Sequence, residues 1–243
     1  MFGFGKHYLP DDFFRGACDV HCHLLPGVDD GFPSTEKSLY ALKKLEEWGV
    51  KKMLLTPHFM KDYPDNNRAN IIKEFEAFKA EAAEACNIEL RLAAEYMLDA
   101  RFMDHFEQGF LTLDQGGNHV LGETSYMMYE PGITEMIYEI MCADYQPVVA
   151  HPERYEYANK DNYFRWKDKR YKFQLNLLSL GGAYGSAAVA KANYLLKEGL
   201  YDYVGSDMHN LSNYERFLPE IRLDKKNKAA LEQLLENNKK LFG

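Results

Sequence analysis

Histidine and carboxylate side chains recur in this chain where short apolar segments end. They stand in Asp19-Val20-His21-Cys22-His23, Thr56-Pro57-His58, Ala94-Glu95, Gly122-Glu123, Ala150-His151 and Gly205-Ser206-Asp207-Met208-His209. Imidazole and carboxylate groups are the ligands of divalent ions such as manganese, iron and zinc. Because most of the histidines lie in these places, the pattern predicts a metal site rather than scattered capping or surface residues.

The spacing within two of these motifs suits shared coordination. Side chains two residues apart on an extended strand point to the same face, so His21 and His23 can bind one ion together. The same holds for Asp207 and His209 if that segment remains extended. Cys22, which stands between the two histidines, should then point to the opposite face and serve in packing.

A loop after the first motif offers a further carboxylate. Residues 25–31 read Leu-Pro-Gly-Val-Asp-Asp-Gly. The two glycines permit a tight turn that returns Asp29 or Asp30 to the metals. An ordinary Asp-Gly turn is the alternative for this loop.

Arg154 stands three residues after His151. A guanidinium group presents a rigid fork of donors that suits a phosphate oxyanion. The sequence therefore offers Arg154 as a phosphate-binding residue, and a surface salt bridge with Glu153 or Glu156 is the alternative.

These motifs need a scaffold that brings the ends of the segments together. Candidate strands are 17–21, 50–56, 88–94, 119–123, 147–150, 173–177 and 203–206. Candidate helices are 35–48, 69–85, 133–143, 159–169, 187–198 and 225–240. Pro33-Ser34 and Gly49 mark the two ends of the first helix. The alternation predicts a parallel α/β fold, an open sheet or a closed barrel, in which the carboxyl ends of the strands share one face.

Composition is that of one soluble domain. The 243 residues are 46% hydrophobic and no linker-like segment divides them, so we expect a single domain over residues 1–243. A net charge of −8 argues against a nucleic-acid partner. The chain has no apolar run long enough for a membrane span, and its start, MFGFGKHYLPDDFF, lacks the pattern of a secretory signal. We therefore expect a cytoplasmic protein that does not insert into membranes.

Five motifs, in their order, resemble the polymerase-and-histidinol-phosphatase (PHP) superfamily. They are Asp-Val-His-Cys-His-Leu-Leu-Pro-Gly-Val-Asp-Asp-Gly (19–31), Thr-Pro-His (56–58), Ala-Glu-Tyr (94–96), His-Pro-Glu-Arg (151–154) and Gly-Ser-Asp-Met-His-Asn (205–210). More closely, they resemble its bacterial metal-dependent protein-tyrosine phosphatases of capsule and exopolysaccharide synthesis, the CpsB/CapC type. The first and last motifs are the specific ones, and the motif-bearing region spans about 17–210.

The resemblance implies a distorted (β/α)7 TIM-like barrel, the PHP fold, with a centre of three divalent metal ions. Manganese is the usual activator in the family, and iron or zinc can occupy the same positions. The implied ligands are His21, His23, Asp30, His58, Glu95, Glu123, His151, Asp207 and His209. The resemblance also implies that Asp30 is a ligand rather than Asp29, that Glu95 bridges two ions and that Arg154 binds the phosphate.

The implied function is hydrolysis of a phosphate monoester, most closely protein phosphotyrosine, with a polysaccharide-synthesis tyrosine kinase as the substrate protein. We expect a hydroxide between two metal ions to attack phosphorus in line, while the third ion and Arg154 stabilise the equatorial oxygens. Asp207 and His209 are the candidates for protonating the leaving group. Relatives commonly carry an arginine soon after Asp-x-His-Asn; here the first one is Arg216, so a contact from Arg216 to phosphate stays open.

Three other hypotheses compete with this one. A cysteine-dependent phosphatase needs Cys-x5-Arg, and the residues six after the four cysteines are Leu24, Val28, Leu92 and Val148, so we set it aside. A PHP phosphoesterase that acts on histidinol phosphate, a sugar phosphate or a nucleotide shares nearly all the site residues and stays open. A metal-binding module without catalysis is the third hypothesis, although such a protein would be expected to have lost ligands.

Overall fold

The computed structural model describes residues 7–9 and 12–242. Its main strands are β2 (Cys18–Cys22), β3 (Lys52–Leu55), β4 (His58–Phe59), β5 (Glu89–Leu92), β6 (Glu95–Met97), β7 (His119–Glu123), β8 (Gln146–Ala150), β9 (Lys172–Asn176) and β10 (Tyr203–Gly205). Its α-helices are α1 (Thr35–Trp48), α2 (Arg68–Ala85), α3 (Phe102–Gln108), α4 (Ile133–Cys142), α5 (Lys160–Asp168), α6 (Gly185–Lys197), α7 (Leu211–Phe217) and α8 (Lys225–Phe242). A short antiparallel pair, β1 (His7–Tyr8) and β11 (Arg222–Leu223), stands apart from the main strands.

Two breaks in the strands shape the sheet. β3 ends at Leu55 and the chain resumes as β4 at His58, with Pro57, which has no amide hydrogen, between them. β5 and β6 are likewise separated by two residues. In both cases the first piece pairs within the order β2-β3-β5 and the second within β10-β9-β8-β7-β6-β4, always in parallel. The breaks place His58 opposite Glu95 on paired strands, not beyond the strand ends where the sequence analysis put them.

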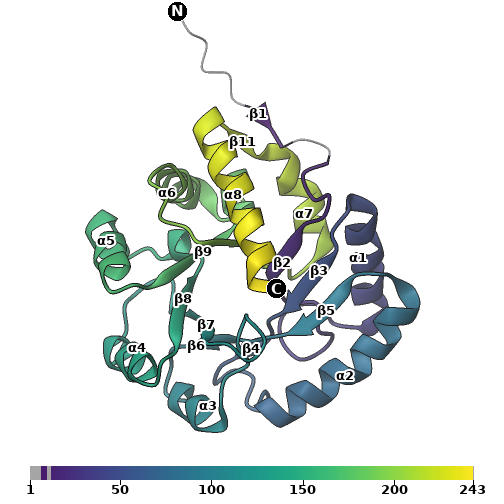
Figure 1. The fold of residues 1–243 in the computed structure, drawn as a ribbon, viewed down its shortest axis with the longest axis horizontal. Coiled ribbons are helices and arrows are strands. Elements are labelled where there is room, and N and C mark those ends of the chain that lie inside the picture. Colours follow the sequence, from purple (N-terminus) through teal and green to yellow (C-terminus); the bar gives the residue numbers. More distant parts are fainter. Residues whose placement is uncertain (1–6, 10–11, 243) are drawn as a thin grey trace, which may run out of the picture.

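The strands form two sheets that curl together, and β2 of the smaller sheet lies beside β10 of the larger one. The amide of Asp207 donates to the backbone oxygen of His21 across 2.7 Å, and Cys22 forms a parallel bridge with Met208. In Figure 1 the strands accordingly curve around a centre, with helices α1 to α6 on the outside. The predicted α/β class is confirmed, in the form of a curled parallel half-barrel.

Helix α8 closes the junction between β2 and β10. The side-chain amide of Asn238 donates to the backbone oxygens of Cys18 at 2.8 Å and Val204 at 2.6 Å. Beyond it, Leu241 and Phe242 pack into the interior of the curled sheet. The inward side chains that share this cluster include Val20, Leu54, Ala93, Leu121, Val148 and Ala150. Because Cys18 begins β2, α8 covers the amino-terminal end of the sheet and leaves the carboxyl-terminal end for the site (Figure 1).

Several elements match the sequence prediction closely. α1 spans 35–48 as expected; the Ser34 side chain caps its start, and Gly49, at φ 102°, ends it in the left-handed conformation. β7 spans 119–123, also as expected. β4 and β6 were missed, since strands of two and three residues are too short to show an alternating pattern. α3 and α7, with seven residues each, were missed because they span too few turns to show a helical period.

Within residues 7–9 and 12–242, none of the helices combines the length and the apolar character that a membrane crossing requires. Residues 1–6 and 10–11, which belong to the segment in which no secretory signal was found, lie outside the described residues.

Candidate metal centre

The nine side chains implied as metal ligands lie together at the carboxyl-terminal end of the curled sheet. They form three overlapping groups, and in each group one ligand atom per residue lies within 4.8 Å of the others. The groups are His23-Asp30-His58-His209, His21-Glu95-His151-Asp207 and His58-Glu95-Glu123. All members are buried except Asp30 and His209, which therefore mark the open edge of the site.

Glu95 lies at the centre of the cluster and is completely buried. Its Oε2 atom lies 3.2 Å from Nε2 of His21 and 3.3 Å from Nε2 of His23. The same oxygen lies 3.1 Å from Nδ1 of His58, and Oε1 lies 3.0 Å from Nε2 of His151. The carboxylate is thus surrounded by four imidazoles, and the bridging of two ions that the family resemblance implies for Glu95 stays a prediction.

Both histidines of the His-x-His motif are oriented by acceptors outside the cluster. Nδ1 of His21 lies 2.8 Å from Oε1 of Gln174, and Nδ1 of His23 lies 2.8 Å from Oδ2 of Asp29. With Nδ1 carrying the hydrogen, the Nε2 lone pair of each ring faces the cluster, as in metal-binding histidines. The two Nε2 atoms lie only 3.2 Å apart. The sequence analysis predicted the shared face of the two rings but neither of their acceptors.

The buried donor atoms fit a divalent metal ion. Oε2 of Glu95 and Nδ1 of His58 are buried and lie 3.1 Å apart, yet neither atom makes a well-oriented hydrogen bond among the residues that the structure describes, and such atoms are rare in proteins. Burial and His23 oppose protonation of His58, but the nearby carboxylates of Glu123 and Glu95 outweigh them and raise its pKa to about 10. Burial raises the pKa of Glu95, yet the imidazoles around it hold that pKa well below its usual value. The Glu95 carboxylate is thus ionised and attracts positive charge.

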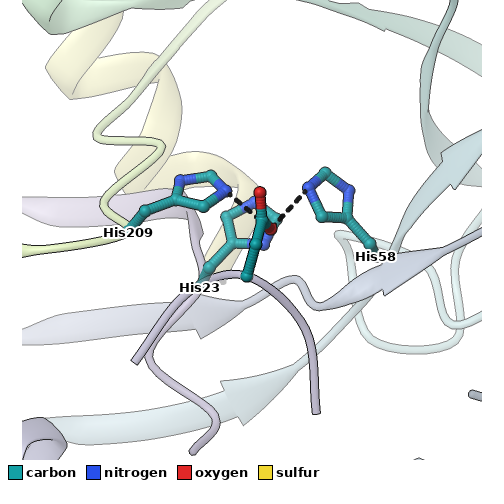
Figure 2. Close-up of side chains that lie close together, drawn as sticks. His23, His58 and His209 are labelled. Carbon is teal, nitrogen blue, oxygen red and sulfur yellow. Dashed lines mark ion pairs between the residues drawn. The ribbon is translucent and has the colours of Figure 1, made fainter. Parts of the chain in front are cut away.

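The two aspartates of the loop have different places. Oδ1 of Asp30 lies 3.4 Å from Nε2 of His58 and 3.3 Å from Nε2 of His209, so Asp30 belongs to the ligand group. Figure 2 shows the rings of His23, His58 and His209 lying close together at this side of the cluster. Asp29 lies behind His23, and it also accepts from the backbone amide of His58 at 3.1 Å.

Gly31 allows the loop to return so closely. A Cβ atom at this position would collide with the backbone oxygen of His23 and lie 2.6 Å from its Cβ atom. The glycine is therefore required by the close approach of the loop to the His-x-His strand.

The segment from Asp207 to His209 is not extended, as shared orientation on a strand would require. Asp207 has φ 49°, in the left-handed region, which costs free energy for a residue other than glycine. Even so, Oδ1 of Asp207 lies 3.4 Å from Nε2 of His21 and 3.5 Å from Nδ1 of His209, while His209 also belongs to the group with Asp30. Nδ1 of His209 lies 3.0 Å from the backbone oxygen of Asp207, so its Nε2 faces Asp30. His151, at φ 31°, has a similarly strained backbone.

Arg154 points into the site and makes neither of the surface pairs considered for it. Its Nη1 donates to Oδ2 of Asp207 across 2.7 Å. The guanidinium carbon lies 4.4 Å from the ring centre of Tyr126 and 4.1 Å from that of Tyr184. Glu153 is instead fully buried and accepts from the backbone amide at the end of β9 at 3.0 Å. The two tyrosine rings hold the guanidinium plane at the edge of the cluster.

Asn176, at the end of β9, is a site residue that the sequence analysis missed. Its Nδ2 donates to Oδ2 of Asp207 at 2.7 Å and to the hydroxyl of Tyr184 at 3.0 Å. Tyr126 was missed as well; its hydroxyl donates to Oε2 of Glu123 at 3.1 Å. Asn176 lies near the end of a predicted strand, as Glu123 does. This position could have indicated Asn176 as a site residue.

Two further expectations concern residues beside the cluster. Cys22 packs in the core, and its Sγ lies 3.2 Å from the backbone oxygen of Leu54, as its predicted packing role requires. Arg216 lies exposed in the last turn of α7, with its guanidinium carbon 4.9 Å from the ring centre of Phe217. Whether Arg216 contacts phosphate stays an open question.

Comparison with known proteins agrees with the motifs. The family model described as "Capsular polysaccharide synthesis, CpsB/CapC" matches residues 17–240. The chain is 27% identical to the tyrosine-protein phosphatase YwqE of Bacillus subtilis, over 92% of this chain and 90% of that protein. It is 28% identical to the tyrosine-protein phosphatase CpsB of Streptococcus pneumoniae, over 92% of this chain and 97% of that protein.

The fold also has a solved counterpart. A crystal structure from work on YwqE and CpsB, described there as unique metal-dependent tyrosine phosphatases, superimposes with a TM-score of 0.74 and 21% identity over 90% of this chain and 94% of that one. At this identity the superposition establishes the fold alone. The family model, however, covers most of the chain, and the motifs that resembled this family are the ones that build the cluster. The chain therefore belongs to the CpsB/CapC family of capsular polysaccharide synthesis.

Proposed function

We propose that this chain is a metal-dependent protein-tyrosine phosphatase that acts in the regulation of capsular or exopolysaccharide synthesis. The observation that carries the proposal is the ring of four imidazoles around the buried carboxylate of Glu95. The chain that carries this ring belongs to the CpsB/CapC family, and similar proteins are named tyrosine-protein phosphatases. The substrate is a phosphotyrosine protein, and a polysaccharide-synthesis tyrosine kinase is the candidate.

The residues of the three groups would hold three divalent ions, with manganese as the first candidate and iron or zinc as the others. Bound divalent ions activate water as a nucleophile near neutral pH and neutralise phosphoryl charge. Asp29 and Gln174 fix the two rings of the His-x-His motif so that each Nε2 remains free to bind. The two carboxylate oxygens of Glu95 would bind ions at neighbouring positions in the cluster.

Arg154 would bind the phosphoryl oxygens. Its guanidinium lies at the edge of the cluster between the rings of Tyr126 and Tyr184, and a fixed fork of donors suits the equatorial oxygens of a phosphoryl group. Arg154 also donates to the carboxylate of Asp207. On substrate binding, its guanidinium would need to shift only from this carboxylate to the neighbouring phosphoryl group.

Both candidates for protonating the leaving group have at least one polar atom held by neighbouring groups. Nδ1 of His209 bonds to a backbone oxygen, and Nε2 faces Asp30. Oδ2 of Asp207 accepts from Arg154 and Asn176. We therefore propose that Asp207 and His209 act as ligands. A tyrosine leaving group, with a conjugate-acid pKa of about 10, departs with little assistance, which favours phosphotyrosine over alkyl phosphates.

We also propose that the curled sheet is the distorted (β/α)7 barrel of the PHP fold, within a single cytoplasmic domain over residues 1–243. The contacts between β2 and β10 support closure of the barrel. The broken pairs β3/β4 and β5/β6 each count as one strand in that description.

The test is phosphate release from a phosphotyrosine peptide by metal-stripped protein, with and without added Mn²⁺. We expect Mn²⁺ to restore activity in the native protein and not in His21→Ala. His119→Ala is the matched control, because His119 pairs with Asp114 at 2.8 Å, outside the cluster.

Each other result points to one of the alternatives. Release from histidinol phosphate or a sugar phosphate, with none from the peptide, would assign a small-molecule phosphoesterase. Metal binding without turnover of any phosphoester would assign a silent binding module.

A further inference from the structure

A groove of about 720 Å³ runs along the surface from the open edge of the metal centre. One wall is the exposed side of α1, and the other is the start of α7. The side chains of the walls and floor include Phe32, Glu36, Lys37, Tyr40, Lys43 and Leu211. This volume lies within the range of cavities that enclose a sizeable organic ligand.

The groove is continuous with the candidate phosphoryl site. A smaller pocket of about 270 Å³ is lined by Arg154 and Asp207. Asp30, His209 and Asn210 line both the pocket and the groove. A phosphotyrosyl side chain seated against Arg154 would therefore have its main chain near the shared residues, with the groove leading away from it. A small phosphate ester would need only the smaller pocket.

The chemistry of the groove suits an acidic polypeptide. Its lining includes the apolar side chains of Phe32, Leu39 and Leu211, and Tyr40 presents a ring that is 57% exposed. α1 contributes two exposed lysines to the lining, Lys37 and Lys43, against one carboxylate, that of Glu36. The other carboxylate of the lining belongs to the metal-ligand group, where it faces two imidazoles. By contrast, Lys44 on the same helix lies outside the groove lining and is paired with an acidic neighbour at 2.7 Å.

We propose that this groove binds the segment of a phosphotyrosine protein beside the phosphorylated tyrosine, and that Lys37 and Lys43 select acidic residues in that segment. The inference rests on the proposed function, and it adds a determinant of substrate choice outside the metal centre. It also accounts for the size of the groove, which exceeds what a phosphate ester alone would fill.

The experiment compares kcat/KM for three phosphotyrosine peptides that differ only in their flanking residues, Glu, Ala or Lys on both sides. p-Nitrophenyl phosphate serves as the substrate without a polypeptide. The variants are Lys37→Glu/Lys43→Glu and the matched control Lys44→Glu. We expect the native enzyme and the control to prefer the Glu peptide over the Lys peptide by about three- to tenfold, the effect of two partly exposed ion pairs. The double variant should reverse that order and keep its rate on p-nitrophenyl phosphate.

Equal rates for the three peptides in the native enzyme would overturn the groove proposal alone. So would an equal loss on p-nitrophenyl phosphate and on the peptides in the double variant. Hydrolysis of p-nitrophenyl phosphate with none of any peptide would overturn the proposed protein phosphatase function, and the groove proposal with it.

Discussion

Asn176 donates a hydrogen bond from its Nδ2 atom to Oδ2 of Asp207 across 2.7 Å. Arg154 donates to the same oxygen, so both donors occupy Oδ2. Oδ1 of Asp207 is thereby left for the cluster, 3.4 Å from Nε2 of both His21 and His23. Asn176 thus helps to determine which oxygen of Asp207 faces the cluster.

Replacing Asn176 by Leu should lower metal affinity and activity by about 10- to 100-fold, the usual effect of removing a partner that orients a metal ligand. Mn²⁺ affinity, measured by competition with a chelator, tests this directly. Asn70→Leu, on the exposed side of α2, provides the matched change away from the site. Native Mn²⁺ affinity in Asn176→Leu would show that Arg154 alone orients Asp207.

The two loop aspartates should respond differently to the same change. Asp29→Asn keeps every ligand but removes the charge that fixes Nδ1–H of His23, so we expect metal affinity to fall by about 10- to 100-fold. Asp30→Asn alters a ligand at the open edge, where the side chain is 60% exposed, and should release one ion while the others stay bound. The metal content of the two variants, measured by atomic emission after dialysis, distinguishes their effects. An equal number of ions per chain in both variants would contradict the different roles assigned to Asp29 and Asp30.

Binding of Mn²⁺ should release protons. Burial opposes protonation of His58, but the carboxylates of Glu123 and Glu95 raise its pKa to about 10, so the metal-free imidazole is charged at pH 7. A ligand imidazole is neutral, so the metal must displace that proton, and Mn²⁺ affinity should rise with pH up to about 10. Calorimetric titration in two buffers with different ionisation enthalpies measures the release. His58→Gln should release fewer protons; heats that are independent of the buffer would refute the prediction.

His105 should make the protein sensitive to acid. It lies buried on α3, with its ring centre 5.7 Å from that of Tyr96. Burial, and then the charge of Arg101, lower the pKa of His105 below its usual value, although two nearby aspartates oppose this. In the unfolded chain His105 therefore takes up a proton near pH ~6.5, whereas in the folded protein it stays neutral at that pH. The free energy of unfolding falls as the pH drops through that range.

His105→Leu should reduce this loss. Urea unfolding at about pH 8 and about pH 5, on either side of the ordinary histidine pKa, measures the difference in unfolding free energy. Chelator is present throughout so that metal binding does not contribute. The variant should lose less stability than the native protein between the two values. An identical loss would mean that the proton is taken up elsewhere.

The sequence sufficed for the parts of the site that lie at strand ends. Parallel strands carry their carboxyl ends to one face, so His151 after β8 and Glu123 at the end of β7 could be placed together without coordinates. The choice of Asp30 over Asp29 came from the family resemblance, because both residues stand in the same turn. Their different roles depend on a close approach that only the folded loop reveals.

Other site residues have no local signal. Gln174 lies within β9 and acts on His21 across a separation of 153 residues. Tyr126 and Tyr184 lie on either side of Arg154. They come from separate segments of the chain, and no hydrophobic pattern in the sequence indicates that these segments meet. Asp207 has a left-handed backbone conformation, which the sequence pattern cannot distinguish from an extended one.

The hydrogen bond from Asn238 to the backbone of Cys18 joins positions 220 residues apart. On the ribosome, β2 emerges long before its partners in β10 and α8 are translated. The nascent chain must therefore carry exposed apolar strands until α8 has emerged, a state prone to capture by chaperones or to aggregation. Synonymous codon changes that slow translation between β2 and α8 would lengthen that exposure, and yield in the cell would depend on elongation speed as well as on the final free energy of folding.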